Sequence, residues 1–81
     1  MRRYHFHVFN GQNYAFDGEG MMLPDLTAVV SEAEHRARLE MNAQIDVREW
    51  TDWKIDVRGE DDITIFFYPF DELRTRKASR A

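Results

Sequence analysis

Apolar and polar positions alternate along the first sixteen residues, which is the pattern of a pair of strands. A strand is predicted over residues 3–9, because successive side chains of a strand point to opposite faces. Asn10-Gly11 then predicts a type I′ turn, since both central residues of that turn need positive φ. A return strand is predicted over 12–16, and the glycines of the segment 17–20 end it.

The next segment changes to helical spacing. Apolar residues recur three and four positions apart, which predicts one amphipathic helix over residues 25–43. Pro24 suits a helix start because its missing N–H is not needed there, and Asp25 can cap the first turn. Glu32 and Glu34 each precede an arginine by four residues, which is the more favourable orientation for a surface pair. The apolar stripe must cover another element of the fold.

A second hairpin is predicted after the helix. Residues 53–58 alternate clearly between apolar and charged positions, and residues 59–62 have the composition of a turn. The last strand is predicted over 63–68. Pro69 ends it, because proline cannot donate a hydrogen bond to a neighbouring strand.

The simplest assembly of these elements is a two-layer α+β domain in the order β-β-α-β-β, with one helix across one face of a four-stranded antiparallel sheet. The predicted core combines the inward strand positions with the helix stripe: Tyr4, Phe6, Val8, Leu26, Val29, Val30, Ala33, Ala37, Trp53, Ile55, Val57, Ile63, Ile65 and Phe67. Residues 1–70 form this single domain. Residues 71–81 are predicted to be a flexible basic tail.

The sheet face that the helix leaves bare carries the candidate partner-binding residues. They mix aromatic, histidine and charged side chains: His5, His7, Phe9, Lys54, Asp56, Arg58, Phe66 and Tyr68. A plainly solvated face does not usually gather three aromatic residues, and contiguous apolar patches tend to mark interfaces. The pattern therefore predicts contact with a protein partner or a second copy. The competing interpretation is that the tail or the 44–52 loop folds over this face.

Charge separates the domain from its tail. Residues 1–70 hold seven Lys/Arg and thirteen Asp/Glu, a difference of −6, and residues 71–81 hold four and two, a difference of +2. An acidic body repels phosphate, so nucleic-acid binding through the sheet aromatics and the tail is the alternative rather than the main prediction. A third interpretation is that the acidic body imitates nucleic acid, but its carboxylates are scattered over helix, loops and turns.

The sequence contains no constellation typical of an enzyme. The absence of cysteine excludes thiol catalysis and disulfides, and neither Ser31 nor Ser79 has a glycine elbow or a placed base. His5 and His7 share a strand face at a spacing that can serve a divalent metal, but no third histidine is placed beside them, so no metal or cofactor is predicted. No apolar run has the length of a membrane span or a signal peptide, which favours a cytoplasmic protein.

Four short motifs follow one another along residues 3–70: Arg3-Tyr4-His5-Phe6-His7-Val8, Leu23-Pro24-Asp25-Leu26, Trp53-Lys54-Ile55-Asp56-Val57 and Phe67-Tyr68-Pro69-Phe70. In this order they resemble a widespread family of small bacterial proteins classed as a domain of unknown function. The resemblance implies the same fold, a bacterial cytosolic origin and no catalytic residues. It also implies a structural task for His7, such as bonding the segment 17–20. The turn at 59–62 departs from the Asp-Gly turn often found in that family.

Overall fold

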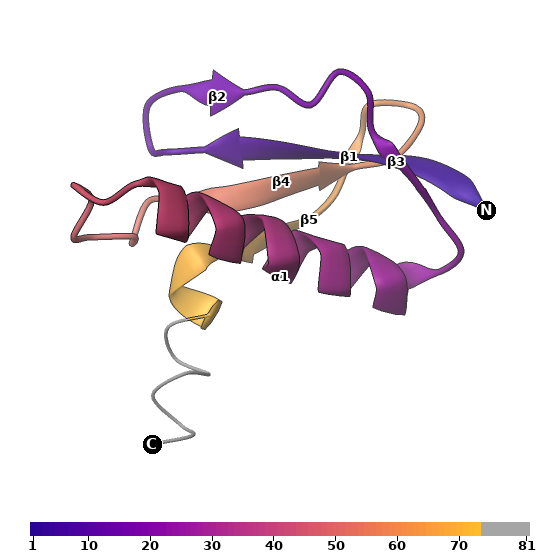
Figure 1. Cartoon of the computed structure of the whole chain (residues 1–81). Coiled ribbons are helices and arrows are strands. Elements are labelled where there is room, and N and C mark those ends of the chain that lie inside the picture. The colour runs from indigo at the N-terminus through magenta and orange to yellow at the C-terminus, as the bar shows by residue number, and fades with distance from the viewer. Residues whose placement is uncertain (74–81) are drawn as a thin grey trace.

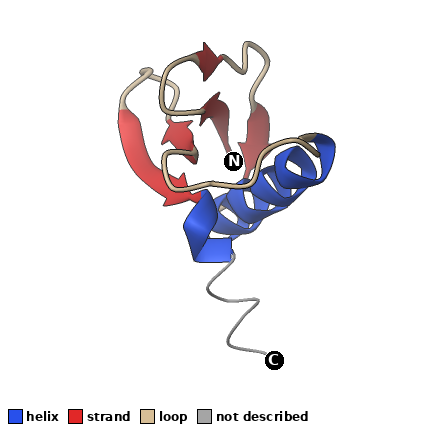
Figure 2. Cartoon of the chain, turned by 90° about the vertical axis from the view of Figure 1, so that its left-hand side faces the viewer, coloured by secondary structure: helices blue, strands red, loops and turns tan. Residues whose placement is uncertain are grey.

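A computed structural model describes residues 1–73 of the chain, so the predicted tail beyond Leu73 lies outside the described residues. One long helix crosses one face of an antiparallel sheet (Figure 1), which confirms the predicted α+β class. The elements are β1 (Arg2–Phe9), β2 (Tyr14–Ala15), β3 (Met21–Leu23), α1 (Leu26–Ala43), β4 (Lys54–Arg58) and β5 (Thr64–Pro69). Figure 2 shows α1 and the helical residues 70–73 on the same side of the sheet.

The long strand β1 organises the sheet. The spatial order is β2-β1-β4-β5, and β3 pairs with the N-terminal half of β1 on the same edge that β2 borders further along. All of these pairs are antiparallel. The prediction of four strands is therefore one strand short. A strand of three residues between two loops is too short to show an alternation of apolar and polar positions.

The first hairpin turns one residue later than predicted. The backbone N–H of Asn10 donates to the carbonyl of Asn13 at 3.1 Å, so Gly11 and Gln12 are the central residues. Of these two, only Gly11 has a positive φ, at 97°. The turn is therefore not type I′. The side-chain oxygen of Asn10 accepts hydrogen bonds from the backbone N–H groups of Gln12 and Asn13, and so replaces a backbone carbonyl.

Helix α1 begins at the predicted cap, where the Asp25 side chain accepts a hydrogen bond from the backbone N–H of Ala28 at 2.9 Å. Its buried stripe consists of residues four positions apart: Val29, Ala33 and Ala37. Leu26 and Val30 were assigned to the core by their spacing, but both are exposed. They lie beside the buried stripe, which is narrow because it consists of one valine and two alanines.

The last strand faces the opposite way from the prediction. Its pairing places Phe66 opposite Val57 and Tyr68 opposite Ile55, so Phe66 and Tyr68 lie on the helix side of the sheet with the core. The three residues of this strand that the pattern assigns to the core are exposed instead: Ile63, Ile65 and Phe67. The predicted placement of Phe66 and Tyr68 on the bare face is therefore wrong.

The apolar pattern alone could not decide this orientation. Five of the six residues in the segment 63–68 are apolar or aromatic, so the pattern has no period of two. The deciding contact comes from Phe70, which shares the phase of Phe66 and Tyr68 and is fully buried. Its ring packs against those of both tryptophans, with centroids 5.5 Å from each, and the two tryptophan centroids are 4.9 Å apart. This cluster fixes which side of β5 turns toward the helix.

A β-bulge marks the start of β5. Val57 pairs with Phe66, but the next residue, Arg58, pairs with Thr64, so Ile65 is an extra residue with no partner of its own on β4. The bulge turns the side chain of Thr64 to the face away from α1. That change in direction completes the polar cluster described below.

Candidate functional site

Strand pairing gathers six of the eight predicted binding residues on the face away from α1, which we call the open face. The register of β1 and β4 places His5 beside Arg58, His7 beside Asp56, and Phe9 beside Lys54. Phe66 and Tyr68, on the helix side, do not belong to this face. Thr64 and Phe67 of β5, and Tyr14 and Phe16 of the first hairpin, occupy it in addition. Strand alternation would have identified Tyr14 in either register, because moving the turn by one residue changes its partner only from His7 to Phe9, and these two residues share this face.

Asp56 is the centre of the open face and is only 1% exposed. One carboxylate oxygen accepts a hydrogen bond from the Thr64 hydroxyl at 2.8 Å, and the other accepts from Nε and Nη2 of Arg58 at 3.1 and 2.9 Å. Burial raises the pKa of this carboxyl, but hydrogen bonding to Arg58 and Thr64 outweighs burial and leaves the pKa below its ordinary value. A satisfied ion pair therefore lies beneath the surface of the open face.

His5 and His7 are both held by the backbone of Asp17. The Asp17 N–H donates to Nδ1 of His7 at 2.9 Å, and Nδ1 of His5 donates to the Asp17 carbonyl at 2.9 Å. The structural task implied for His7 is thus present. An accepting Nδ1 places the proton of neutral His7 on Nε2, which is buried and has no hydrogen-bond partner among the described residues. Within residues 1–73, no three His, Cys, Asp or Glu side chains are grouped to hold a metal ion.

The carboxylate of Asp17 fills the gap along β1 between β2 and β3. One oxygen accepts from the backbone N–H of Phe6 at 3.1 Å and from Nη1 of Arg36 at 3.2 Å. The other accepts from the backbone N–H groups of Gly20 and Glu19 at 3.0 and 3.3 Å. Burial raises the pKa of Asp17, but these hydrogen bonds and the Arg36 charge together lower it. Asp17 therefore acts as a substitute strand residue and ties the sheet to α1.

Acid should destabilise the protein in two separate pH ranges. Burial and the nearby Arg58 charge lower the pKa of His7 from its ordinary value of 6.5. Just below pH 6.5 the unfolded chain therefore binds more protons than the folded one, and stability falls as the pH falls. Asp17 and Asp56 have pKa values below their ordinary 3.8, so their contribution is present above pH 3.8 and is lost as the pH falls through their folded pKa values.

The measurement is urea unfolding above pH 6.5, between pH 6.5 and 3.8, and below pH 3.8. We expect a lower unfolding midpoint in each successive range. The His7→Gln variant should lose the first decrease and keep the second. A wild-type protein equally stable in the first two ranges would contradict the assignment of His7 as a buried neutral side chain.

An aromatic layer covers the polar centre of the open face. Phe9 and Tyr14 have ring centroids 4.8 Å apart, and Tyr14 stacks on Phe16 at 5.2 Å with an interplanar angle of 12°. The Lys54 ammonium lies 4.2 Å from the Phe67 ring centroid and 5.4 Å from that of Phe9. Phe16 is nevertheless 69% exposed and Phe67 45% exposed. The layer shields Asp56 and His7 but is itself only partly covered by the described residues.

Acidic residues flank the open face at both ends. At one end Asp62, 74% exposed in its side chain, bonds Nη1 of Arg58 at 3.2 Å. At the other end the exposed side chain of Asp52 lies against the turn at Gly11. The face therefore has an apolar and cationic middle between carboxylates.

A comparison with protein families finds that residues 3–71 match the family described as Domain of unknown function (DUF6894). The chain belongs to this family. The match covers nearly all of the described fold and confirms the resemblance to a domain of unknown function. Comparisons with curated proteins and with solved structures give no match.

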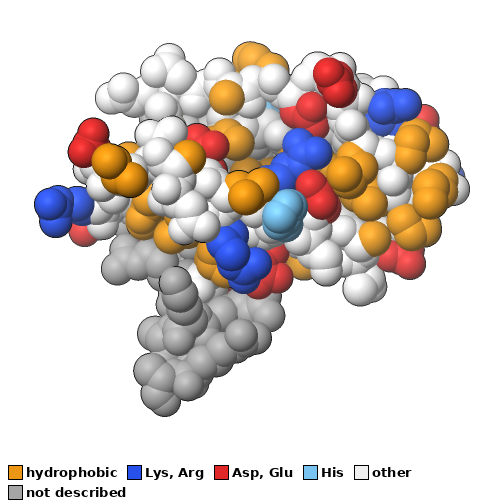
Figure 3. Space-filling view, viewed as in Figure 1, with side chains coloured by type: hydrophobic (Ala, Val, Ile, Leu, Met, Phe, Trp, Pro, Cys, Tyr) orange, Lys and Arg blue, Asp and Glu red, His pale blue; other side chains and the backbone are white. Residues whose placement is uncertain are grey.

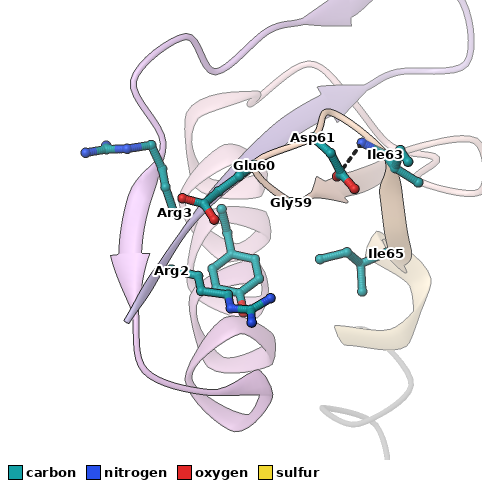
Figure 4. Close-up of a pocket in the computed structure, with 8 residues that line it drawn as sticks. Arg2, Arg3, Gly59, Glu60, Asp61, Ile63 and Ile65 are labelled. Atoms are coloured by element: carbon teal, nitrogen blue, oxygen red, sulfur yellow. Dashed lines mark hydrogen bonds between the residues drawn. The ribbon is translucent and has the colours of Figure 1, made fainter.

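A hollow of about 390 Å³ is present in this DUF6894 protein. It lies between the start of β1 and the turn that joins β4 to β5. Figure 4 shows Arg2 and Ile65 pointing into it from opposite sides, while Arg3 points away. Its wall also includes Glu60 and Asp61, and the Asp61 carboxylate accepts from the backbone N–H of Ile63 at 3.1 Å. The wall holds neither a serine nor a histidine.

A second exposed apolar area lies at the start of the helix. Figure 3 shows hydrophobic side chains gathered at the end of the molecule where α1 begins and β3 lies. The exposed large hydrophobic residues of these elements are Met21, Met22, Leu26 and Val30. No helix within residues 1–73 is long and apolar enough to cross a membrane. The DUF6894 domain thus offers two candidate contact surfaces, of which only the open face combines apolar contact with oriented charge.

Proposed function

We propose that this DUF6894 protein is a non-enzymatic interaction module that binds a partner protein through the open face. The observation that carries the proposal is the aromatic layer, in which Phe16 and Phe67 are 69% and 45% exposed on a sheet face that no helix of residues 1–73 covers. Aromatic residues beside a polar rim are typical of protein interfaces. The bacterial origin and cytoplasmic location predicted from the sequence are part of the same proposal.

The charges on this face favour a partner segment that combines apolar side chains with a carboxylate. Arg58 is already paired with Asp56 and Asp62. Lys54 instead lies over aromatic rings, and none of its described contacts is with a carboxylate. A carboxylate of the partner could pair with Lys54 while its apolar neighbours cover Phe67.

Single-stranded nucleic acid is the alternative occupant. Its bases could stack on Tyr14 and Phe16, whose rings are nearly parallel. The carboxylates of Asp52 and Asp62 at the two ends of the face would repel its phosphates, and Arg58 has no unpaired charge to offer. The arrangement therefore favours protein over nucleic acid.

The test is quantitative affinity capture from an extract of the native host with the full chain as bait. We expect Phe16→Ser and Lys54→Glu each to reduce recovery of the specific partner at least about tenfold. The first variant removes an exposed aromatic ring, and the second reverses the charge of Lys54. Ile45→Ser is the matched control, since Ile45 is fully outside the open face and highly exposed. The amount of partner that Ile45→Ser recovers should equal the amount that the wild type recovers.

Two outcomes would overturn the proposal. One is equal recovery of the partner by wild type, Phe16→Ser and Lys54→Glu, with all three shown to be folded by circular dichroism. The other is recovery that disappears after nuclease treatment, together with a gel shift of single strands at low salt. That result would assign the face to nucleic acid instead.

A further inference from the structure

The strand β5 ends the sheet, and its outer edge pairs with no other strand of residues 1–73. We propose that this edge pairs antiparallel with β5 of a second copy of the chain, so that two sheets become one continuous sheet. This inference concerns the backbone edge of β5, which borders the open face, and goes beyond the proposed function. It depends on which backbone groups point outward, on the side chains beside them, and on charge.

Phe67 directs its backbone groups to the outer edge. In an antiparallel pair, the residues that bond to a given neighbouring strand recur at every second position. The N–H of Phe70 donates to the carbonyl of Trp53 at 3.0 Å, which places Phe70 in the phase that bonds toward β4. Tyr68 and Phe66 share this phase. Phe67 and Pro69 have the opposite phase and face outward, although proline offers only its carbonyl.

Thr64 also faces outward, on the other side of the bulge. The N–H of Gly59 donates to the carbonyl of Ile63 at 3.2 Å, so Ile63 bonds inward and Thr64 has the outward phase. Ile65 is the extra residue of the bulge, so Thr64 and Phe67 act as neighbouring outward positions although they are three apart in sequence.

These two positions suit pairing about a two-fold axis. Thr64 of one copy would lie opposite Phe67 of the other, and the reverse, with each pair exchanging both of its N–H···O bonds. An axis perpendicular to the sheet keeps both helices on the same side, so the open faces also become continuous. Pro69 and the bulge limit this contact to residues 64–67 but leave its donors and acceptors in place.

The side chains favour a second copy as the occupant. The segment 63–68 has no charged residue, so two copies place no like charges opposite one another even though the whole chain carries a net charge of −4. Ile65 and Phe67 are exposed beside the edge, and the same two residues of the second copy would cover them. The other short strands at the opposite edge, β2 and β3, have only two and three residues.

The experiment combines sedimentation of the wild-type chain with amide hydrogen exchange. We expect the measured mass to rise from 9.7 kDa toward twice that value as the concentration is raised to millimolar. The amide hydrogens of Thr64 and Phe67 should become protected as the mass rises and lose that protection on dilution. The amide of Val57 serves as the internal control. Val57 lies in β4 and pairs with Phe66 of β5, so its amide should be protected at every concentration.

Cross-linking tests the register, because the chain has no cysteine of its own. A mixture of Thr64→Cys and Phe67→Cys chains should form a mixed disulfide, since Cα atoms of a hydrogen-bonded pair lie about 5.5 Å apart. Each variant alone should cross-link at least about tenfold less, because like positions are offset by about 7 Å along the strands.

A chain that stays monomeric up to millimolar concentration would overturn the inference. So would a dimer in which dilution leaves the exchange of Thr64 and Phe67 unchanged, which would point to another surface, such as the apolar area around Met22. None of these readouts uses the partner captured by the open face, so the two proposals can fail independently.

Discussion

Asp56→Ala should lower the free energy of unfolding by about 3 kcal/mol, which is the effect of removing one member of a buried hydrogen-bonded ion pair. The carboxylate accepts three hydrogen bonds, one from the Thr64 hydroxyl and two from the Arg58 guanidinium. Alanine leaves these donors without an acceptor beneath the aromatic layer and also leaves a cavity. The measurement is urea denaturation at neutral pH, read from the midpoint and the slope.

Asp62→Asn is the matched control for this experiment, because Asp62 has a positive φ of 64° that asparagine tolerates and alanine does not. Asp62 bonds the same Arg58 side chain, at 3.2 Å, but is 74% exposed. Exposed ion pairs typically contribute less than about 1 kcal/mol, so this variant should be close to the wild type. Equal losses in the two variants would contradict the conclusion that burial of Asp56, rather than its charge alone, stabilises the open face.

The outcome bears on function because Asp56 sets the geometry of the candidate binding surface. Arg58 bonded to Asp56 also lies 5.7 Å from the Tyr14 ring centroid, which links the centre of the open face to the first hairpin. If Asp56→Ala is folded but less stable, its partner recovery should fall as well. The polar cluster would then support the aromatic layer as well as the fold.

The elements with a strong period could be predicted from the sequence. Strands β1 and β4 alternate without interruption, so their faces were correct, and six of the eight candidate residues meet as expected. The cap of α1 and three members of its predicted stripe, Val29, Ala33 and Ala37, were also correct. In β5 the period is absent, and the prediction chose the wrong face. The orientation of this strand is decided by the burial of Phe70 against the two tryptophans.

Other features depend on contacts between distant segments, which the sequence does not display. Burial of Asp56 and His7 on the open face requires Tyr14 and Phe16 from the first hairpin and Thr64 from the bulge. Strand β3 requires the loop before it to be anchored. The Asp17 carboxylate lies in a glycine-rich loop, where aspartate is typical of a turn. Its spacing in the sequence does not indicate that it bonds both β1 and α1.

Asp17, which anchors this loop, gives the second large expected effect. Asp17→Ala should lower the free energy of unfolding by about 2–3 kcal/mol, because it leaves the N–H of Phe6 without an acceptor and removes one of the two carboxylates that pair with Arg36. The amide of Phe6 should also exchange faster relative to that of Val57, which local loss of the clamp predicts and uniform destabilisation does not. Asp17→Asn, which keeps one acceptor oxygen, should be intermediate.

Asp25→Ala is the control for this variant, since Asp25 also accepts a backbone hydrogen bond, from Ala28, but at an exposed helix cap. Loss of such a cap typically costs about 1 kcal/mol. If Asp17→Ala were no worse than Asp25→Ala, the carboxylate would be an ordinary turn acceptor, and the gap between β2 and β3 would not need it. A clearly larger loss, with faster exchange at Phe6, means that the Asp17 carboxylate holds β1 in place where neither β2 nor β3 reaches it. It also means that His5 and His7, which bond the backbone of Asp17, depend on this residue for their orientation on the open face.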